Sequence, residues 1–133
     1  MSIQTNGFHH VGIRVTDLSR ARAFYVDTLG FQPVLELPRL IIVNANGSLL
    51  GIQGNAPETA QGDRFDPFRV GLDHIGLGVG DVAELGRLKE QLDRSGVRNN
   101  GVEDDAVLGA KYISFYDPDG IALELYAMPA QPR

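Results

Sequence analysis

Cysteine is absent from the 133-residue chain. This excludes a disulfide framework, a thiolate nucleophile and a thiolate metal site, so any bound metal must take nitrogen and oxygen ligands. Long apolar runs are also missing, since none approaches the roughly 20 residues that cross a bilayer. The N-terminal MSIQTNGFHH has neither the basic nor the apolar region of a signal peptide. We therefore expect a cytoplasmic protein with no membrane partner.

Basic residues are too few and too scattered to form a nucleic-acid surface. Twelve Lys and Arg stand against seventeen Asp and Glu, a net charge of -5. Apolar residues make up 43% of the chain and charged residues 22%, values typical of a soluble globular domain. A chain of this length buries a core as one domain. The partners we expect are a small molecule and a second copy of the chain.

An internal repeat divides the chain. HVGIRVTD at residues 10–17 recurs as HIGLGVGD at residues 74–81, nearly half the chain later. In both copies apolar residues alternate with others, which is the period of a half-buried strand. Glycines on the opposite face leave space beside each histidine. That face carries His10, Gly12 and Arg14 in one copy and His74, Gly76 and Gly78 in the other.

Each repeat continues with signals for one helix and three strands. Asp17 or Ser19 caps a helix that Gly30 ends, and Asp81 caps a helix that Gly96 ends. The strands that follow are expected at residues 34–37, 40–44 and 49–53, then near residue 102 and at residues 111–116 and 121–126. The order βαβββ therefore occurs twice. Module one spans about 7–53, module two spans about 72–127, and the Gly- and Pro-rich segment 54–71 is a linker or lid.

Two histidines and one glutamate are candidate metal ligands. Histidines at equivalent strand starts project from the same face, so pairing the modules side by side would bring His10 and His74 together. Glu124 alternates with Leu123 and Leu125, and burying this acid is costly unless it is paired or metal-bound. Such a set suits one divalent ion, Fe, Mn, Ni, Co or Zn, and leaves coordination positions open for substrate. In the alternative reading, the histidines only satisfy hydrogen bonds in their strands.

Three neighbouring residues carry weaker signals. Arg14 lies on the face of His10 and can bind a substrate carboxylate or phosphate, or simply be solvated. Tyr126, two residues past Glu124, can donate a proton or a hydrogen bond, or simply pack at the strand end. His9 is expected to point away from His10 by strand alternation.

The repeats resemble the vicinal oxygen chelate superfamily. The residues that carry the resemblance are HVGIRVTDLSRARAFYVDTLGF at 10–31, LDHIGLGVGD and DPDGIALEL. This superfamily includes glyoxalase I, extradiol dioxygenases, methylmalonyl-CoA epimerase, fosfomycin-resistance enzymes and bleomycin-resistance proteins. The resemblance implies an α+β fold in which two βαβββ modules form a U-shaped, partly open mixed β-barrel cup with the helices outside. It also implies metal ligands at His10, His74 and Glu124, and a homodimer.

At several positions this sequence departs from the patterns of individual families, which narrows the range of activities that the resemblance implies. Gly51 stands where glyoxalase I has a second ligating glutamate, which disfavours lactoylglutathione lyase activity. Arg14 and Asn55 match glutathione-contacting positions, and Gln53 reaches the same face as Gly51. Lys111 stands where extradiol dioxygenases carry an acid-base histidine, which disfavours ring cleavage. The basic phosphonate pocket and potassium loop of the fosfomycin enzymes are not found.

The first functional hypothesis is therefore a metalloenzyme, a lyase, isomerase, transferase or dioxygenase, whose small substrate chelates through oxygen atoms. Glu124 and Tyr126 are its catalytic candidates, and Arg14, Gln53 and Asn55 are its substrate contacts. The alternative is a metal-free protein of bleomycin-resistance type that sequesters an aromatic or cationic drug. A degenerate module that only binds a partner ranks third. The cup closes within one chain or by module exchange in a dimer.

Overall fold

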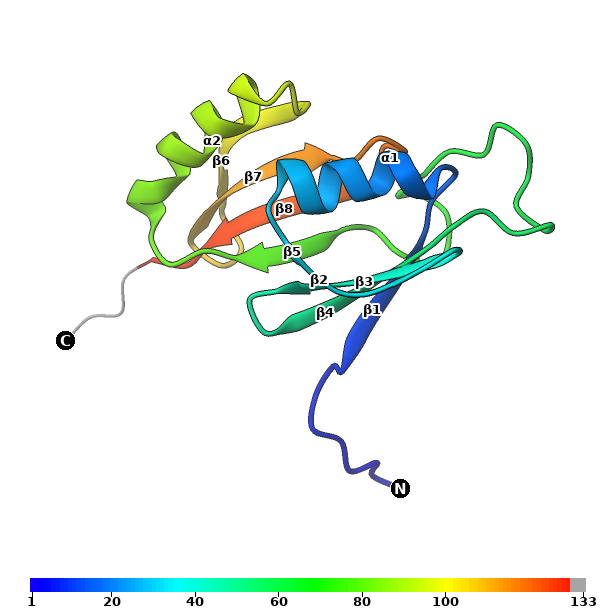
Figure 1. Cartoon of the computed structure of the whole chain (residues 1–133). Coiled ribbons are helices and arrows are strands. Elements are labelled where there is room, and N and C mark those ends of the chain that lie inside the picture. The colour runs from blue at the N-terminus through cyan, green and yellow to red at the C-terminus, as the bar shows by residue number, and fades with distance from the viewer. Residues whose placement is uncertain (130–133) are drawn as a thin grey trace. The chain divides into compact units, whose positions relative to one another are not determined.

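The computed structural model describes residues 1–129 (Figure 1). The chain divides into two compact units, Met1–Asp63 and Arg64–Arg133, whose placement relative to one another is not determined. The division falls inside the segment 54–71 that the sequence marks as a linker. Among residues 1–129, no helix has the length and apolar character that crossing a membrane requires.

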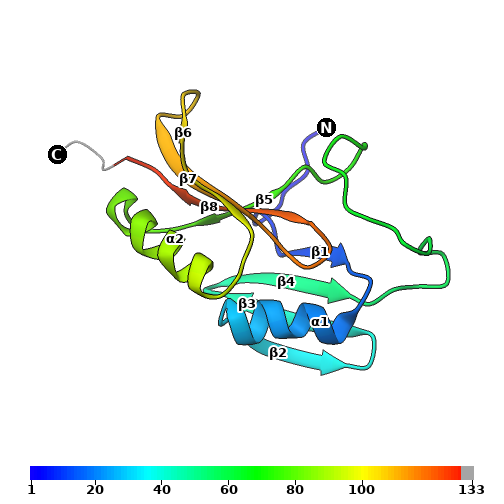
Figure 2. The ribbon, with the colours of Figure 1, turned by 90° about the horizontal axis from the view of Figure 1, so that it is seen from above.

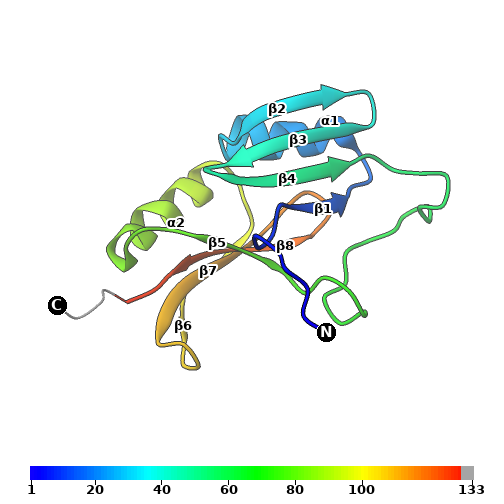
Figure 3. The ribbon, with the colours of Figure 1, turned by 90° about the horizontal axis from the view of Figure 1, so that it is seen from below.

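Unit 1 contains the first βαβββ module. Its elements are β1 (His10–Arg14), α1 (Leu18–Arg22), the π-helix η1 (Ala23–Thr28), β2 (Gln32–Leu37), β3 (Leu40–Ala45) and β4 (Ser48–Gln53). The strand order is β1-β4-β3-β2, with β1 parallel to β4 and the other pairs antiparallel. Helix α1 covers one face of this sheet, which Figures 2 and 3 show from opposite sides. The other face remains for polar groups.

The first helix differs from the sequence prediction in its second half. Asp17 caps it as expected, because its Oδ1 accepts a hydrogen bond from the Arg20 amide at 3.0 Å. Gly30 ends it with a φ of 78°. Between these limits the helix widens to π geometry, and the Leu29 amide donates to the Phe24 carbonyl at 2.8 Å. Phe24 and Tyr25 lie in this segment and are both buried.

Unit 2 repeats the module. Its elements are β5 (Ile75–Gly78), the 3₁₀-helix η2 (Val82–Glu84), α2 (Leu85–Arg94), β6 (Asn99–Asp105), β7 (Ala110–Tyr116) and β8 (Ala122–Ala127). The order β5-β8-β7-β6, with β5 parallel to β8, reproduces that of unit 1. The α+β fold of two βαβββ modules is thus confirmed. The second strand begins at Ile75, so His74 lies one residue before it, whereas His10 is inside β1.

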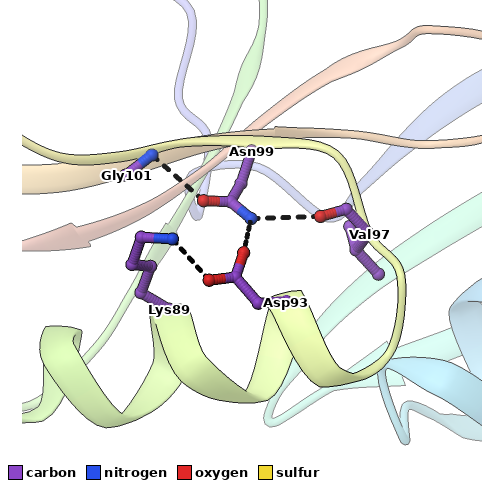
Figure 4. A network of polar contacts seen from close by, with 5 residues as sticks. All are labelled: Lys89, Asp93, Val97, Asn99 and Gly101. Carbon is purple, nitrogen blue, oxygen red and sulfur yellow. Dashed lines mark hydrogen bonds and ion pairs between the residues drawn. The ribbon is translucent and has the colours of Figure 1, made fainter.

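A polar network ties the end of α2 to the start of β6 (Figure 4). Asp93 accepts hydrogen bonds from Lys89 and from the Asn99 amide group, the latter at 2.8 Å. Asn99 also donates to the Val97 carbonyl at 3.0 Å and accepts from the Gly101 amide at 3.0 Å. These bonds lie at the register shift of β6 between Asn99 and Val102.

Strand alternation separates the core from the polar face in both sheets. In β1, Ile13 is buried while His10, Gly12 and Arg14 are exposed, and Val15 continues the buried side. In β8, Leu123 and Ala127 are buried. The largest fully buried side chains are Tyr25, Val15, Val43 and Ile52 in unit 1 and Leu85, Ile113, Phe115 and Leu123 in unit 2. The predicted ligand residues therefore lie on the faces away from these cores.

Candidate functional site

His74 and Glu124 come together across the parallel pair β5 and β8. The register places Gly76 opposite Glu124, and the Nε2 atom of His74 lies 3.3 Å from Oε1 of Glu124. The His74 side chain is 42% exposed and that of Glu124 is 16% exposed. A Cβ at Gly76 or Gly78 would meet nothing within 4 Å. The expected open space beside the histidine is thus confirmed for unit 2.

Asp73 fixes the other edge of the His74 imidazole. The Nδ1 atom of His74 donates to Oδ1 of Asp73 at 2.6 Å, which leaves Nε2 directed to Glu124. Histidines that bind metals almost always donate their second ring N–H to a carboxylate, a carbonyl or water, because this fixes the tautomer and orients the ring. Asp73 was not predicted as a site residue, although it directly precedes His74 in the sequence.

Burial and nearby acids shift the ionisation of Glu124. Burial raises the pKa of Glu124, His74 lowers it, and Asp105, Asp73 and Glu103 raise it further. The net direction is upward, so the carboxyl group gives up its proton less readily than an exposed glutamate. A carboxylate in such surroundings is stabilised by a cation.

Tyr126 belongs to a wider polar face of the same sheet. Its hydroxyl donates to Oδ2 of Asp105, which lowers the pKa of Asp105 and, together with burial, raises that of Tyr126 to about 12. The ring of Tyr126 stacks on Tyr112, with centroids 6.0 Å apart and planes at 16°. A hydrogen bond to Glu103 is the main cause that raises the pKa of Tyr112.

We call Glu103, Asp105, Tyr112, Glu124 and Tyr126 the acidic-aromatic face. The register pairs Glu103 with Tyr112 and Tyr112 with Tyr126, which places these side chains in one row across β6, β7 and β8. The members of this face from β6 and β7 were not predicted from the sequence. Strand alternation assigns a residue to a face only when the pairing of its strand is known. The sequence placed β6 only near residue 102, so its pairing with β7 could not be predicted.

His10 in unit 1 has an unexpected neighbour. The Nδ1 atoms of His9 and His10 lie 2.9 Å apart, and their rings meet edge to face with centroids 5.1 Å apart. The expectation that His9 points away from His10 is wrong, because β1 begins at His10 and strand alternation does not extend to His9. Each predicted histidine ligand thus has its Nδ1 engaged by the residue that precedes it.

The register supports the comparison of Gly51 with Glu124. Gly51 lies opposite Gly12 in β4, as Glu124 lies opposite Gly76 in β8. A Cβ at Gly51 would meet the Val11 carbonyl oxygen at 3.7 Å and Leu40 Cδ1 at 4.0 Å, which are ordinary contacts. Unit 1 therefore accepts a Cβ at this position but carries no carboxylate there.

The three predicted substrate contacts gather at one end of β1 and β4. Arg14 is paired in register with Gln53, and its Nη1 donates to the Gly54 carbonyl at 2.8 Å. Asn55 follows directly and lines a cavity of about 360 Å³. The structure thus brings Arg14, Gln53 and Asn55 into one neighbourhood within unit 1.

The donor set of unit 2 fits a divalent ion in part. Nitrogen and oxygen donors bind an ion such as zinc at about 2.0–2.2 Å, so two donors on the same ion lie about 3–3.5 Å apart. The distance between Nε2 of His74 and Oε1 of Glu124 is 3.3 Å. Within residues 1–129, no group of three or more His, Cys, Asp or Glu side chains forms a complete metal site. Unit 2 therefore supplies a two-ligand set that needs a further donor.

Sequence relatives cover most of the chain. The YwkD protein of Bacillus subtilis (strain 168) is 30% identical over 124 residues, which are 89% of this chain and 94% of that protein. Catechol-2,3-dioxygenase of the same organism is 32% identical over 123 residues, 89% of this chain but 41% of the dioxygenase.

Solved structures have the same fold. A glyoxalase family protein from Enterococcus faecalis is 27% identical with a TM-score of 0.75, covering 91% of this chain and 97% of its own. The fosfomycin resistance protein FosX from Listeria monocytogenes, complexed with Mn(II), is 19% identical with a TM-score of 0.72 and coverage of 94% and 92%.

The family model that matches this chain spans both repeats. It covers residues 7–125, and its description is Glyoxalase/Bleomycin resistance protein/Dioxygenase superfamily. The match includes both predicted histidine ligands and Glu124. With the repeated βαβββ topology, it shows that the chain belongs to this superfamily, whose members include glyoxalases, dioxygenases and fosfomycin resistance proteins.

Proposed function

We propose that the chain is a divalent-metal-dependent enzyme of this superfamily that acts on a small substrate chelating through oxygen atoms. The observation that carries the proposal is the Asp73–His74–Glu124 arrangement. Asp73 holds Nδ1 of His74 at 2.6 Å, while Nε2 lies 3.3 Å from the Glu124 carboxylate. An oriented imidazole beside a partly buried acid is the ligand pair expected of such a centre.

The metal ligands we propose are His10, His74 and Glu124. His74 and Glu124 rest on their mutual geometry, whereas His10 rests on the sequence repeat and the family resemblance. His10 completes the set from the same chain or from a second copy. The ion, Fe, Mn, Ni, Co or Zn, would act as a Lewis acid that stabilises negative charge developing on a substrate oxygen.

The chain's own residues have distinct roles in this proposal. Asp73 orients His74. Glu124 has a raised pKa. Its carboxyl group therefore exchanges a proton with a substrate more readily than a fully ionised carboxylate would. Tyr126, with a pKa of about 12 and its proton held by Asp105, serves as a hydrogen-bonding group on the substrate face. Arg14, Gln53 and Asn55 remain the proposed substrate contacts.

Two residues restrict the reaction class. Gly51 supplies no carboxylate at the position equivalent to Glu124, which disfavours glyoxalase I chemistry. Lys111 is ion-paired with Asp104, with Nζ and Oδ1 2.6 Å apart, and alternates with Tyr112 along β7, so it does not share the face of Glu124. This disfavours an acid-base role for Lys111 in ring cleavage.

Metal analysis tests the proposal. Protein purified without chelator should contain about one divalent ion per chain, and His74→Ala should lose it while keeping its circular dichroism spectrum. The charge-neutral control is Asn100→Ala, at an exposed position of β6. A wild-type protein that neither retains nor binds any of the five metals would contradict the proposal.

A second candidate function is supported by the acidic-aromatic face. Two stacked tyrosines beside Glu103 and Asp105 suit an aromatic cation, because carboxylates attract its charge and the rings offer a π surface. The protein would then sequester a drug or antibiotic without metal. Intact affinity for a cationic aromatic dye after chelator treatment, reduced in Tyr112→Ala, would favour this function. Loss of dye binding when the metal is removed would favour the metal-dependent enzyme.

Location and assembly remain predictions. We expect the protein in the cytoplasm, with a small molecule as substrate and a second copy of the chain as partner.

A further inference from the structure

The polar face of the unit 2 sheet continues past Glu124 to a part that the proposed function does not use. Three alternate residues of β7 lie on this face, and each is paired in register with a residue of β8: Tyr112 with Tyr126, Ser114 with Glu124, and Tyr116 with Ala122. Alternate residues of a strand are about 7 Å apart, at roughly 3.4 Å per residue. Tyr116 therefore lies one row beyond Glu124, on the side away from Tyr112.

Arg98 covers the ring of Tyr116. Its Cζ atom lies 4.1 Å from the ring centroid, which is a cation–π contact, and its carbonyl accepts a hydrogen bond from the Tyr116 amide at 3.1 Å. The Asn100 side-chain amide donates to the Tyr116 hydroxyl at 2.9 Å. Because the hydroxyl is the acceptor in this bond, its own proton can be donated to a further group. We call Arg98 and Tyr116 the cationic corner.

The guanidinium of Arg98 has no carboxylate partner. Within residues 1–129 it makes no hydrogen bond or ion pair, whereas Arg22 forms a salt bridge with Glu36. Asp117 directly follows Tyr116, but it is buried, and its carboxylate accepts from two backbone amides of the next turn, each at 2.9 Å. The cationic corner therefore offers a planar guanidinium and a hydroxyl proton, which together suit an anion.

The charges of this face are ordered along its strands. Glu103 is paired in register with Tyr112, and Asp105 accepts the hydrogen bond of Tyr126 in the same part of the face. Arg98 lies at the opposite end, with Glu124 in the row between. An anionic group is attracted to the end of Arg98 and repelled from the end of the two acids. The face thus orients a charged ligand as well as binding it.

The row between the two ends has room for the body of a ligand. Its member on β7 is the small Ser114, which lies between two tyrosines and opposite Glu124. On the other side of Glu124, Gly76 has no side chain, and a Cβ built there would meet nothing within 4 Å. A ligand held at the cationic corner can therefore place its other atoms beside Glu124.

We propose that the substrate of this face is an organic acid whose carboxylate binds Arg98 and the Tyr116 hydroxyl. The guanidinium donates two parallel hydrogen bonds to the carboxylate, and the hydroxyl donates a third. The metal-chelating oxygens of the substrate then lie one row away, about 7 Å from its carboxylate. Arg98 is thus the residue that determines specificity. This substrate class rests on the proposed enzyme function, but binding of the carboxylate itself needs no metal.

The test is an NMR titration of the chelator-treated full-length protein at neutral pH with benzoate, benzamide and benzylamine. Benzoate should give saturable shifts at residues 98 and 114–116. Benzamide has nearly the same shape without the charge, so it should bind at least about tenfold more weakly, because hydrogen bonds to charged groups are the stronger ones. Protonated benzylamine should instead shift residues 103–105, where the carboxylates lie.

Three variants identify the groups involved. Arg98→Gln should weaken benzoate binding at least about tenfold, and Arg98→Lys should restore part of it, because lysine keeps the charge but not the planar fork. Tyr116→Phe removes only the hydroxyl donor and should weaken benzoate binding by about tenfold. The matched control is Arg94→Gln, which removes the same charge from the last residue of α2 and should leave benzoate binding unchanged.

The proposal is overturned by any of three results. These are an absence of saturable shifts at residues 98 and 114–116, equal affinity for benzoate and benzamide, and an Arg98→Gln variant that binds benzoate as tightly as the wild type. Metal content is measured separately. A protein that binds benzoate in this way but takes up no metal would support the cationic corner while contradicting the proposed enzyme function. A protein that binds metal but not benzoate would overturn the cationic corner alone.

Discussion

In both units the residue before the predicted histidine ligand contacts its Nδ1 atom. Asp73 accepts a hydrogen bond from His74, and the His9 and His10 rings meet through their Nδ1 atoms. The two contacts differ in chemistry. The Asp73 carboxylate makes the His74 imidazole a better metal ligand, whereas the neutral imidazole of His9 brings no charge to His10. We infer that unit 2 would carry the stronger half of the proposed metal centre.

Replacing Glu124 by glutamine separates its role in metal binding from its role in stability. Because burial raises the pKa of Glu124, the folded protein favours the neutral carboxyl group relative to the unfolded chain. A neutral amide of the same shape should therefore leave the thermal midpoint of the metal-free protein unchanged or slightly higher. Metal affinity should fall by at least about 100-fold, since even loss of a supporting partner costs about 10–100-fold.

The matched control is Glu103→Gln, which removes the same charge from the same face of the sheet. Calorimetric metal titration of both variants at neutral pH checks the prediction. Equal losses in the two variants would show that the charge of the face, rather than ligation by Glu124, attracts the ion.

Gly51→Glu tests whether unit 1 retains the position of a lost ligand. The site accepts a Cβ without a close contact, and its register matches that of Glu124. The new carboxylate should lower the stability of the metal-free protein, because Gly51 is buried and a buried unpaired charge is costly. It should raise metal affinity by about tenfold or more, on the scale on which metal-site partners act.

Thermal melts with and without the ion provide the measurement, and Gly51→Gln is the control of equal size without charge. The metal-induced rise in Tm should be larger for Gly51→Glu than for both Gly51→Gln and the wild type. An equal rise in all three proteins would contradict the proposed equivalence of the two positions.

At the level of secondary structure, Asp93 links α2 to β6 through Lys89 and Asn99. The hydrogen bond from Lys89 is the largest cause that lowers the pKa of Asp93 from its ordinary value of 3.8, and that from Asn99 is the next. A carboxyl group with a lowered folded-state pKa contributes its stability above the unfolded value, and this contribution disappears as the pH falls through the folded value.

Asp93→Asn should therefore lower the urea midpoint at neutral pH by a modest amount, because all three side chains are solvent-accessible. The difference from the wild type should vanish in strong acid below the folded pKa. Glu90→Gln on the same helix is the control and should show a smaller effect at neutral pH. A difference that persists unchanged in acid would mean that the network acts through packing instead of charge.

At the level of the whole molecule, the edge strand of unit 1 exposes several large apolar side chains. Val34, Leu35 and Leu37 in β2 are 57%, 41% and 49% exposed, and β2 is the last strand of its sheet. Edge strands with exposed apolar residues tend to pair with other chains. We expect light scattering to show a homodimer, and Leu35→Lys to shift it toward the monomer.

The control for this prediction is Val107→Lys, in the turn between β6 and β7, where valine is 90% exposed. It should leave the mass unchanged. A wild-type monomer at all accessible concentrations would contradict the predicted homodimer, and an equal effect of the two lysines would contradict the role of β2.

The elements of the fold were predictable because their signals are local. The strand at His10–Arg14, the helix caps at Asp17 and Asp81 and the stops at Gly30 and Gly96 follow from alternation and capping within a few residues. The π-helix Ala23–Thr28 was not predictable. It buries Phe24 and Tyr25, and an α-helix over the same residues would bury the same pair, so the apolar pattern is the same for both helix types.

By itself, the sequence determined the duplicated βαβββ order, the polar faces of the strands and the equivalence of His10 with His74. These depend on periodicity and repetition along the chain. Only the tertiary structure decided that Tyr126 donates to Asp105, 21 residues away, and that Arg14 reaches the carbonyl of Gly54. Such contacts depend on strand register and turn length, which pair residues distant in sequence and which no local pattern encodes.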